Sequence, residues 1–226
     1  MRYLIYIVLI YLVLNYIFPY IMVSWKKNKF QSQIAQLANK NEYKVLEKIK
    51  LPEYDLRERK NEIEAYSKKN KSIKVDYLII SIYGIFVVKL LNLKRGFSGI
   101  KGKENSEKWE HTNFMRYRIA GVGNIFQSSK KISNPILMTK KFIESMKKNL
   151  NIELKNEYFH PFVVILPKIK TVELYEREEN STVIFHNEFN KKISEFNNEV
   201  LSNKEVKEIV KELSQGFLRV TKHLSF

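Results

Sequence analysis

The sequence contains no cysteine among its 226 residues, and only seven glycines and five prolines. Without thiols the chain has no disulfides, no thiolate metal ligands and no cysteine nucleophile, which is compatible with a reducing compartment. Acidic residues are also few, since 24 Asp and Glu face 40 Lys and Arg and the formal net charge is +16. This excess favours polyanions such as nucleic acid or anionic lipid as partners, although a solvated basic surface explains it equally well.

Motifs for several common chemistries are missing. Serine occurs without the Gly-x-Ser-x-Gly turn of the α/β-hydrolases, so hydrolase chemistry of that kind is not supported. Gly121 and Gly123 lack the preceding strand and the third glycine of a dinucleotide-binding loop, which indicates a turn. The four histidines are scattered along the chain at spacings that do not bring two of them onto one metal ion.

The N-terminal region contains a long run without charge. Residues 3–23 read YLIYIVLIYLVLNYIFPYIMV, which is long enough to cross a hydrocarbon core of about 30 Å as a helix. A cleaved signal peptide fits less well, because Arg2 alone would form its basic region and no small-x-small site follows. We therefore expect a transmembrane anchor over residues 1–25. Lys26, Lys27 and Lys29 follow it, so the positive-inside rule predicts a single-pass protein of the cell membrane with a cytoplasmic C-terminal domain.

The rest of the chain predicts one α/β domain. We expect a basic stalk helix over residues 26–37, the domain over 38–200, and an amphipathic helix packed on it over 201–226. Helical spacing covers residues 30–50 up to Pro52, with Asn39 as a break. A weak strand candidate covers 62–66, and two β-branched runs, 73–81 and 85–91, predict a hairpin. A helix after Asn134 and Pro135, between these strands and others at 162–166 and 182–186, indicates a mixed sheet.

Several of these features occur in an order that resembles a known family. Val75-Asp76-Tyr77 lies on the first strand of the hairpin, and Gly84-Ile85-Phe86-Val87-Val88 lies on the second. A glycine-rich segment, Trp109, and Asn134-Pro135 before a helix follow. Together with Glu42, which we place on the preceding helix, this order resembles the nuclease-related domain (NERD) family of the PD-(D/E)xK nuclease superfamily over residues 38–165. The resemblance implies a restriction-endonuclease-like mixed sheet flanked by helices.

The resemblance also implies a site for metal-dependent phosphodiester hydrolysis, and here the sequence departs from the family. Where the family has Glu-x-Lys, this chain has Lys89-Leu90-Leu91, so a cation replaces a carboxylate. Magnesium takes oxygen ligands, and hydrolysis needs carboxylates around the ion. We therefore predict a degenerate site of Glu42, Asp76 and Lys89, in which Lys89 pairs with Asp76. No metal or cofactor is expected, and Asp76 and Glu42 would hold Mg²⁺ if the site were active.

Basic residues interleaved with aromatic ones are typical of nucleic-acid surfaces, where backbone charge and base stacking both contribute. The function we expect is a membrane-anchored, catalytically degenerate module that binds nucleic acid or another partner. Two alternatives stay open: an active metal-dependent DNA endonuclease held at the membrane, and a docking domain for protein or anionic lipid. The candidate nucleic-acid-binding residues are Lys94, Arg95, Lys101, Lys103 and Trp109.

Overall fold

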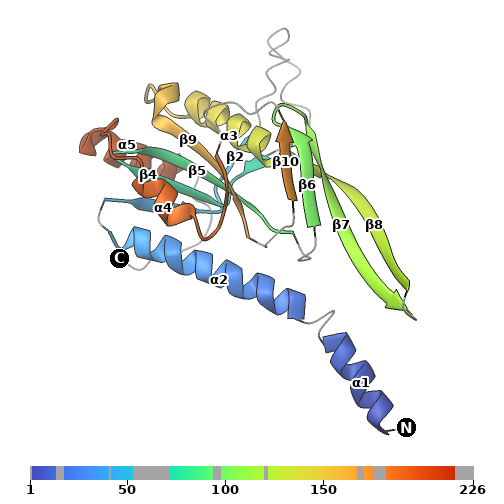
Figure 1. Cartoon of the computed structure of the whole chain (residues 1–226). Coiled ribbons are helices and arrows are strands. Elements are labelled where there is room, and N and C mark those ends of the chain that lie inside the picture. The colour runs from blue at the N-terminus through green and yellow to red at the C-terminus, as the bar shows by residue number, and fades with distance from the viewer. Residues whose placement is uncertain are drawn as a thin grey trace.

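The computed structural model describes residues 2–13, 18–40, 42–52, 72–93, 98–119, 122–166, 171–175 and 182–216. Helix α1 (Arg2–Leu12) and helix α2 (Phe18–Ala38) stand at the N-terminal end and lead into the domain (Figure 1). Helix α1 has 11 residues, and α2 has 21 but includes three lysines, Lys26, Lys27 and Lys29. Within the described part of the chain, no helix combines the length and the apolar character needed to cross a membrane.

The C-terminal half of α2 packs into the domain. Phe30 is fully buried, and its ring meets those of Tyr77 and Phe189 edge-on at centroid distances of 5.8 and 5.0 Å. Ile34 and Leu37 extend the same buried face at helical spacing. The structure therefore differs from the expected stalk over residues 26–37, because from Phe30 onwards the apolar face of this helix fills part of the core.

The helix expected over residues 30–50 ends at Ala38, immediately before Asn39. Residues 44–47 instead form strand β1 (Lys44–Glu47), which pairs antiparallel with β4 (Tyr77–Ser81). Pairing with a fully buried strand satisfies the backbone groups of this segment and buries Leu46 in the core. The helix prediction was wrong beyond Asn39, since short apolar runs do not distinguish a helix from a strand by periodicity alone.

The main sheet is mixed, as predicted. Its described strands lie in the order β1-β4-β5-β9-β11, with β5 (Gly84–Leu91), β9 (Phe159–Ile165) and β11 (Thr182–Phe185). Strands β4 and β5 form the predicted antiparallel hairpin, whereas β5, β9 and β11 run parallel. The hairpin turn requires a glycine at Gly84, where φ is +133° and a Cβ would lie 2.7 Å from the His160 ring. A short 3-10 helix, η2 (Asn156–Tyr158), leads into β9.

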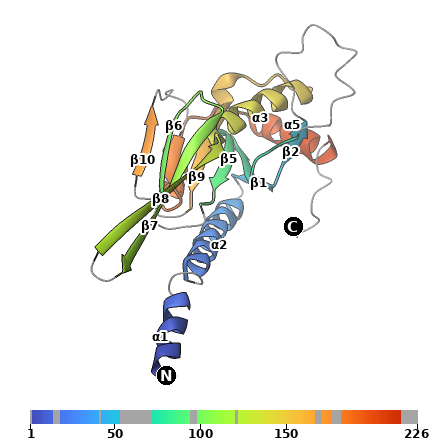
Figure 2. The ribbon, with the colours of Figure 1, turned by 90° about the vertical axis from the view of Figure 1, so that its right-hand side faces the viewer.

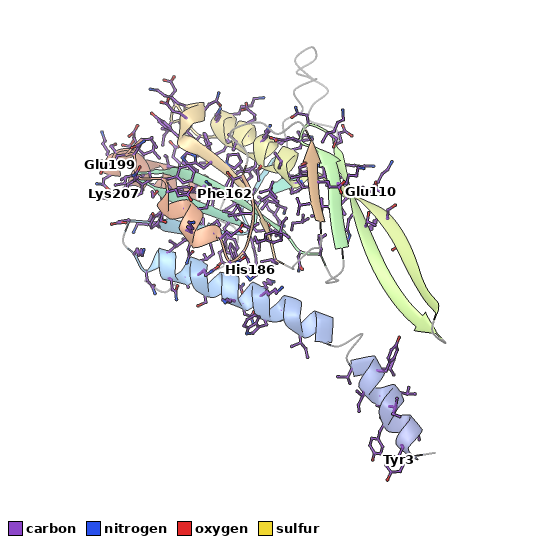
Figure 3. The ribbon with its side chains drawn as sticks, in the orientation of Figure 1. Tyr3, Glu110, Phe162, His186, Glu199 and Lys207 are labelled. Atoms are coloured by element: carbon purple, nitrogen blue, oxygen red, sulfur yellow. The ribbon has the colours of Figure 1, made fainter. Side chains whose placement is uncertain are left out.

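Helices cover both faces of the main sheet (Figure 1). Helices α3 (Pro135–Asn149) and α5 (Asn203–Gly216) pack on one face, where Val87 meets Phe142 and Ile209 in a buried cluster. Helices α2 and α4 (Phe189–Ser194) pack on the other face with Phe86 and Phe162, and Figure 3 shows Phe162 in the interior. Alternate residues of β5 thus fill two different cores, which explains the continuous apolar run from Ile85 to Val88.

A second sheet extends beside the first. Its described strands lie in the order β10-β6-β7-β8, with β10 (Thr171–Tyr175), β6 (Ser98–Lys103), β7 (Lys108–Ile119) and β8 (Val122–Ser133). Because β6 pairs with β7 only as far as Asn113, β7 and β8 continue as a two-stranded ribbon. This ribbon points away from the domain in both views (Figures 1 and 2). Strands β2 (Lys50–Pro52) and β3 (Ser72–Lys74) form a separate antiparallel pair, and β3 ends shortly before β4 begins.

The predicted C-terminal amphipathic helix is α5. It begins with a reciprocal cap, in which the Ser202 N–H donates to Glu205 Oε2 at 2.7 Å and the Glu205 N–H donates to Ser202 Oγ at 3.3 Å. Its apolar face buries Val206, Ile209 and Leu213 in the core. Residues 217–226 and the strand candidate at 62–66 lie outside the described residues.

Candidate functional site

Asp76 stands where β4 stops pairing with β5. Its backbone N–H donates to the Val88 carbonyl at 3.0 Å, and its carbonyl accepts the Lys48 N–H at 2.8 Å. Its carboxylate then takes the place of a backbone acceptor, because Oδ2 accepts the Leu90 N–H at 2.8 Å. The side chain therefore completes the hydrogen bonding of β5 beyond the end of β4. This structural role needs no metal ion.

Lys89 lies directly beside that carboxylate. Its Nζ is 3.2 Å from Asp76 Oδ2, and it also donates to the Lys74 carbonyl at 3.1 Å. The two side chains are 17% and 27% exposed, respectively, so the pair is partly shielded from solvent. The ion pair between Lys89 and Asp76 predicted from the sequence is therefore confirmed as a contact.

The structure does not bring Glu42 to this pair. Glu42 is exposed and lies in the turn before β1, not on a helix as we expected. The register of β1 pairs Lys44 with Ile80 and Glu47 with Tyr77, so Glu42 stands at the opposite end of β1 from Asp76. Five residues of extended chain from Glu42 to Glu47 span about 16 Å. The three predicted site residues thus separate into one pair and one distant carboxylate, because the segment folds as a strand.

Sequence reasoning missed Tyr77, the residue after Asp76, and its hydrogen-bond partner Gln31. Tyr77 is buried, and desolvation raises the pKa of the Tyr77 phenol to about 12, with Glu47 adding to the rise. A hydrogen bond from the Gln31 side chain acts in the opposite direction. Gln31 therefore links helix α2 to Tyr77, the first residue of β4. The position of Tyr77 next to Asp76 was the available signal, but nothing in the sequence pointed to Gln31.

The residues at this place do not fit a divalent metal ion. Magnesium sites are built from several oxygen ligands, whereas Asp76 offers one carboxylate that already holds an ammonium group and a backbone N–H. Across the described residues, no group of three or more acidic, histidine or cysteine side chains has a geometry that could hold a metal. The described residues around Asp76 therefore lack the ligand set of a divalent metal site.

Trp109 does not present a surface for stacking bases. It is 1% exposed, and its indole N–H donates to the Lys103 carbonyl at 3.0 Å. A Cβ at Gly102 would lie only 2.4 Å from Trp109 Cδ1, so the ring packs directly on the backbone of β6. The prediction of Trp109 as a nucleic-acid contact was wrong, because this large apolar ring joins the core between the two sheets.

The other predicted nucleic-acid contacts are lysines and an arginine near β6. Lys101 lies on β6 with its Nζ 3.8 Å from Glu173 Oε2 of the neighbouring strand β10, and Lys103 ends β6. Lys94 and Arg95 lie outside the described residues. The structure therefore places two of these four cations on one strand and leaves the prediction that they bind nucleic acid untested.

Asn134 and Pro135 have a structural explanation. Asn134 Oδ1 accepts the N–H groups of Ile136 and Leu137 at the start of α3, and Nδ2 donates to the carbonyls of Glu104 and Ser106 at 2.5 and 2.7 Å. The amide thus joins the helix to the turn between β6 and β7. The Glu104 side chain is fully buried at this joint and lies 3.2 Å from Lys140 Nζ. This motif therefore fixes the second sheet to α3.

The fold and the Asp76 site define an α/β domain with a mixed sheet flanked by helices, in which an aspartate at a strand end meets the second strand of a hairpin. The chain belongs to the nuclease-related domain (NERD) family, whose model matches residues 24–166. The match includes most of α2, the hairpin with Asp76 and Lys89, and the Asn134 cap, and it begins before the boundary we expected at residue 38. No curated protein and no solved structure matches the chain.

Proposed function

We propose that this protein is a membrane-anchored NERD-domain protein that binds nucleic acid through a degenerate nuclease site and does not cut it. One observation carries the proposal: the Lys89 ammonium lies 3.2 Å from Asp76 Oδ2, in the neighbourhood where a nuclease needs a divalent cation. The anchor, the binding and the loss of cleavage are separable parts, and each has its own support and its own test.

Electrostatics argues against cleavage. At an effective dielectric constant near 20, two unit charges 4 Å apart interact by about 4 kcal/mol, and a divalent ion doubles this repulsion from Lys89. Leu91 stands where a catalytic lysine would be expected from the Glu-x-Lys pattern, and its side chain can neither position water nor stabilise charge. Neither group required for hydrolysis is supplied by this strand.

The charge distribution supports nucleic acid as the partner. There is no Asp or Glu between Glu110 and Glu144, although six Lys and Arg lie in that interval. Such a region attracts a polyanion and contributes little that repels it. Nucleic acid carries this charge at every phosphate, so we expect binding that weakens steeply as salt is added.

The anchor rests on the N-terminal residues. The described apolar side chains of α1 are exposed, including Tyr3 at 84% and Ile7 at 66%, and a surface of this kind is unfavourable in water. Extraction of membranes at alkaline pH should leave the full chain in the pellet. Because the chain has no cysteine, Lys191→Cys supplies a unique exposed thiol, and an impermeant maleimide should label it only after the membrane is opened. Labelling of intact cells would contradict a cytoplasmic domain.

The main test uses the full-length chain in a neutral detergent. Titration calorimetry with MnCl₂ and MgCl₂ should show no binding at micromolar concentration, a supercoiled plasmid should stay intact in magnesium, and a gel shift should show a salt-sensitive complex. Micromolar metal binding that is abolished in Asp76→Ala, or plasmid cleavage with the same dependence, would establish the active endonuclease instead. Absence of both cleavage and a gel shift would favour a docking domain for protein or lipid.

A further inference from the structure

Strands β2 and β3 carry two lysines in direct opposition. The register pairs Lys50 with Lys74, and both side chains are exposed, whereas the next pair, Leu51 with Ile73, is buried in the core. Since alternate residues of a strand point to opposite faces, Lys50 and Lys74 share the outer face of this short ribbon. Two like charges placed directly opposite each other on neighbouring strands destabilise the pair.

Two further lysines adjoin this pair. The Lys48 N–H donates to the Asp76 carbonyl at 2.8 Å, and the Lys89 ammonium contacts the Lys74 carbonyl at 3.1 Å. Lys48 has a φ of +53°, an uncommon conformation for a residue other than glycine. Leu46 and Ile49 are three positions apart, yet both face the same core. The regular alternation of inward and outward side chains is therefore shifted by one position at Lys48.

The resulting cluster is positive even after its acids are counted. Among the described residues, Lys48, Lys50, Lys74 and Lys89 contribute four positive charges within two adjacent strand pairs, while Asp76 and Glu47 contribute two negative ones. Lysine side chains are long and rotatable, so their ammonium groups can converge on a single group from neighbouring strands. An anion with several oxygen acceptors could bind both ammonium groups at once, and its negative charge would offset the repulsion between Lys50 and Lys74.

We propose that Lys48, Lys50, Lys74 and Lys89 bind a backbone phosphate of nucleic acid beside Asp76, at the same end of the hairpin where Lys89 and Asp76 meet. The inference rests on the proposed nucleic-acid binding and assigns its principal phosphate contact. Phosphate is the class of ligand that fits, because it is multiply charged, accepts several hydrogen bonds and can be reached by point-like ammonium groups without fixed geometry.

The test compares two double variants of the full chain in neutral detergent. Lys50→Gln/Lys74→Gln removes two charges from the cluster, and Lys207→Gln/Lys211→Gln removes two exposed charges from α5, where Figure 3 shows Lys207 at the edge of the domain. Binding of a fluorescent 20-nucleotide single strand and of the matching duplex is followed by anisotropy over a salt series. Thermal unfolding of each variant confirms that it is folded.

The cluster variant should bind at least about tenfold more weakly than the wild type, and the slope of log affinity against log salt should fall by about one for each lost phosphate contact. The α5 variant should keep the wild-type slope. Equal losses of affinity in both variants would show that the cluster contributes only general charge attraction. That result would overturn the inference but leave the proposed nucleic-acid binding in place. A wild-type chain that binds neither DNA would instead contradict the proposed function itself.

Vesicles of phosphatidylcholine with and without phosphatidylglycerol provide the last comparison. If the cluster variant loses binding to the anionic vesicles but keeps its affinity for both DNAs, the phosphate recognised by the cluster is a lipid headgroup, and the inference is overturned. Unchanged vesicle binding together with weakened DNA binding supports it.

Discussion

Asp76 Oδ2 lies 3.2 Å from Lys89 Nζ across two neighbouring strands, at the point where the β4–β5 pairing ends. The contact neutralises the charge of the Asp76 carboxylate. It also makes Asp76 a useful probe, because a cation site and an anion site respond to its removal in opposite ways.

Asp76→Asn should strengthen the binding of nucleic acid. The amide oxygen can still accept the Leu90 N–H, but the negative charge is lost and Lys89 becomes available to a phosphate. Anisotropy titrations should show an affinity a few times higher than that of the wild type, which follows from removing one repulsive charge. An active nuclease predicts the reverse, because its metal would lose a ligand and its cleavage would stop.

Lys89→Glu combined with Leu91→Lys should partly restore a metal site. Two carboxylates would then face each other, so the variant should be less stable than the wild type without metal, and Mn²⁺ should stabilise it. At 100 times the dissociation constant the gain would be about 2.7 kcal/mol, measurable as a rise in Tm. Lys89→Gln serves as the control and should show no such response. Failure of Mn²⁺ to stabilise the double variant would show that this place cannot hold a metal even with the acid present.

Trp109→Ala should destabilise the fold by about 3–5 kcal/mol, as expected for a large ring removed from a core. Gly102→Ala tests the same packing from the other side, since its Cβ would lie 2.4 Å from Trp109 Cδ1, and overpacking of this kind costs about 1–3 kcal/mol. Urea unfolding followed by tryptophan fluorescence for Gly102→Ala, and by circular dichroism for both variants, measures the loss. If Trp109→Ala kept its stability and lost only DNA binding, the ring would be a stacking surface after all.

Asn134→Ala should cost about 2–4 kcal/mol. The helix cap contributes about 1 kcal/mol, and the buried carbonyls of Glu104 and Ser106 would lose a donor worth about 1–3 kcal/mol. Asn134→Ser keeps a cap and loses only that donor, so it should fall between the wild type and the alanine variant in urea unfolding. Equal stability of the serine and alanine variants would assign the whole effect to the lost amide donor, whereas a serine variant as stable as the wild type would assign it to the cap.

Stability should decline as the pH falls from about 7 towards 5. Burial lowers the pKa values of His111, His160 and His186, with nearby lysines adding to the effect at His111 and His186. The unfolded chain therefore binds more protons than the folded one below the ordinary histidine pKa of about 6.5, and stability is lost through that range down to the depressed pKa values. Urea unfolding at several pH values measures the slope. His160→Gln should flatten it, and an unchanged slope in that variant would remove His160 from the explanation.

Several parts of the fold could be predicted from local pattern. The hairpin, the helix after Asn134, the strand over 162–166 and the amphipathic C-terminal helix each follow from periodicity or turn chemistry within one segment. Strand β1 could not be predicted in this way, because its choice between helix and strand depends on pairing with β4, more than 30 residues further along the chain. The misplacement of Glu42 follows from that single error.

In the candidate site, too, some features could be predicted from the sequence and others depend on tertiary packing. The contact of Lys89 with Asp76 could be predicted from the sequence, because residues directly opposite in a hairpin are fixed by its turn. The burial of Trp109 and the approach of Gln31 to Tyr77 could not be derived, since each depends on how separate elements pack.

The sequence alone determined which chemical groups this protein carries: a basic chain without cysteine, an apolar N-terminal run, and a lysine, Lys89, on the second strand of the hairpin. Only the tertiary structure decided which of these groups meet. Lys50 and Lys74 are 24 positions apart in the sequence yet face each other on two strands, and Glu42 is separated from Asp76 by the length of β1. The physical reason is that composition and periodicity act locally, whereas strand register and core packing bring distant residues together or hold them apart.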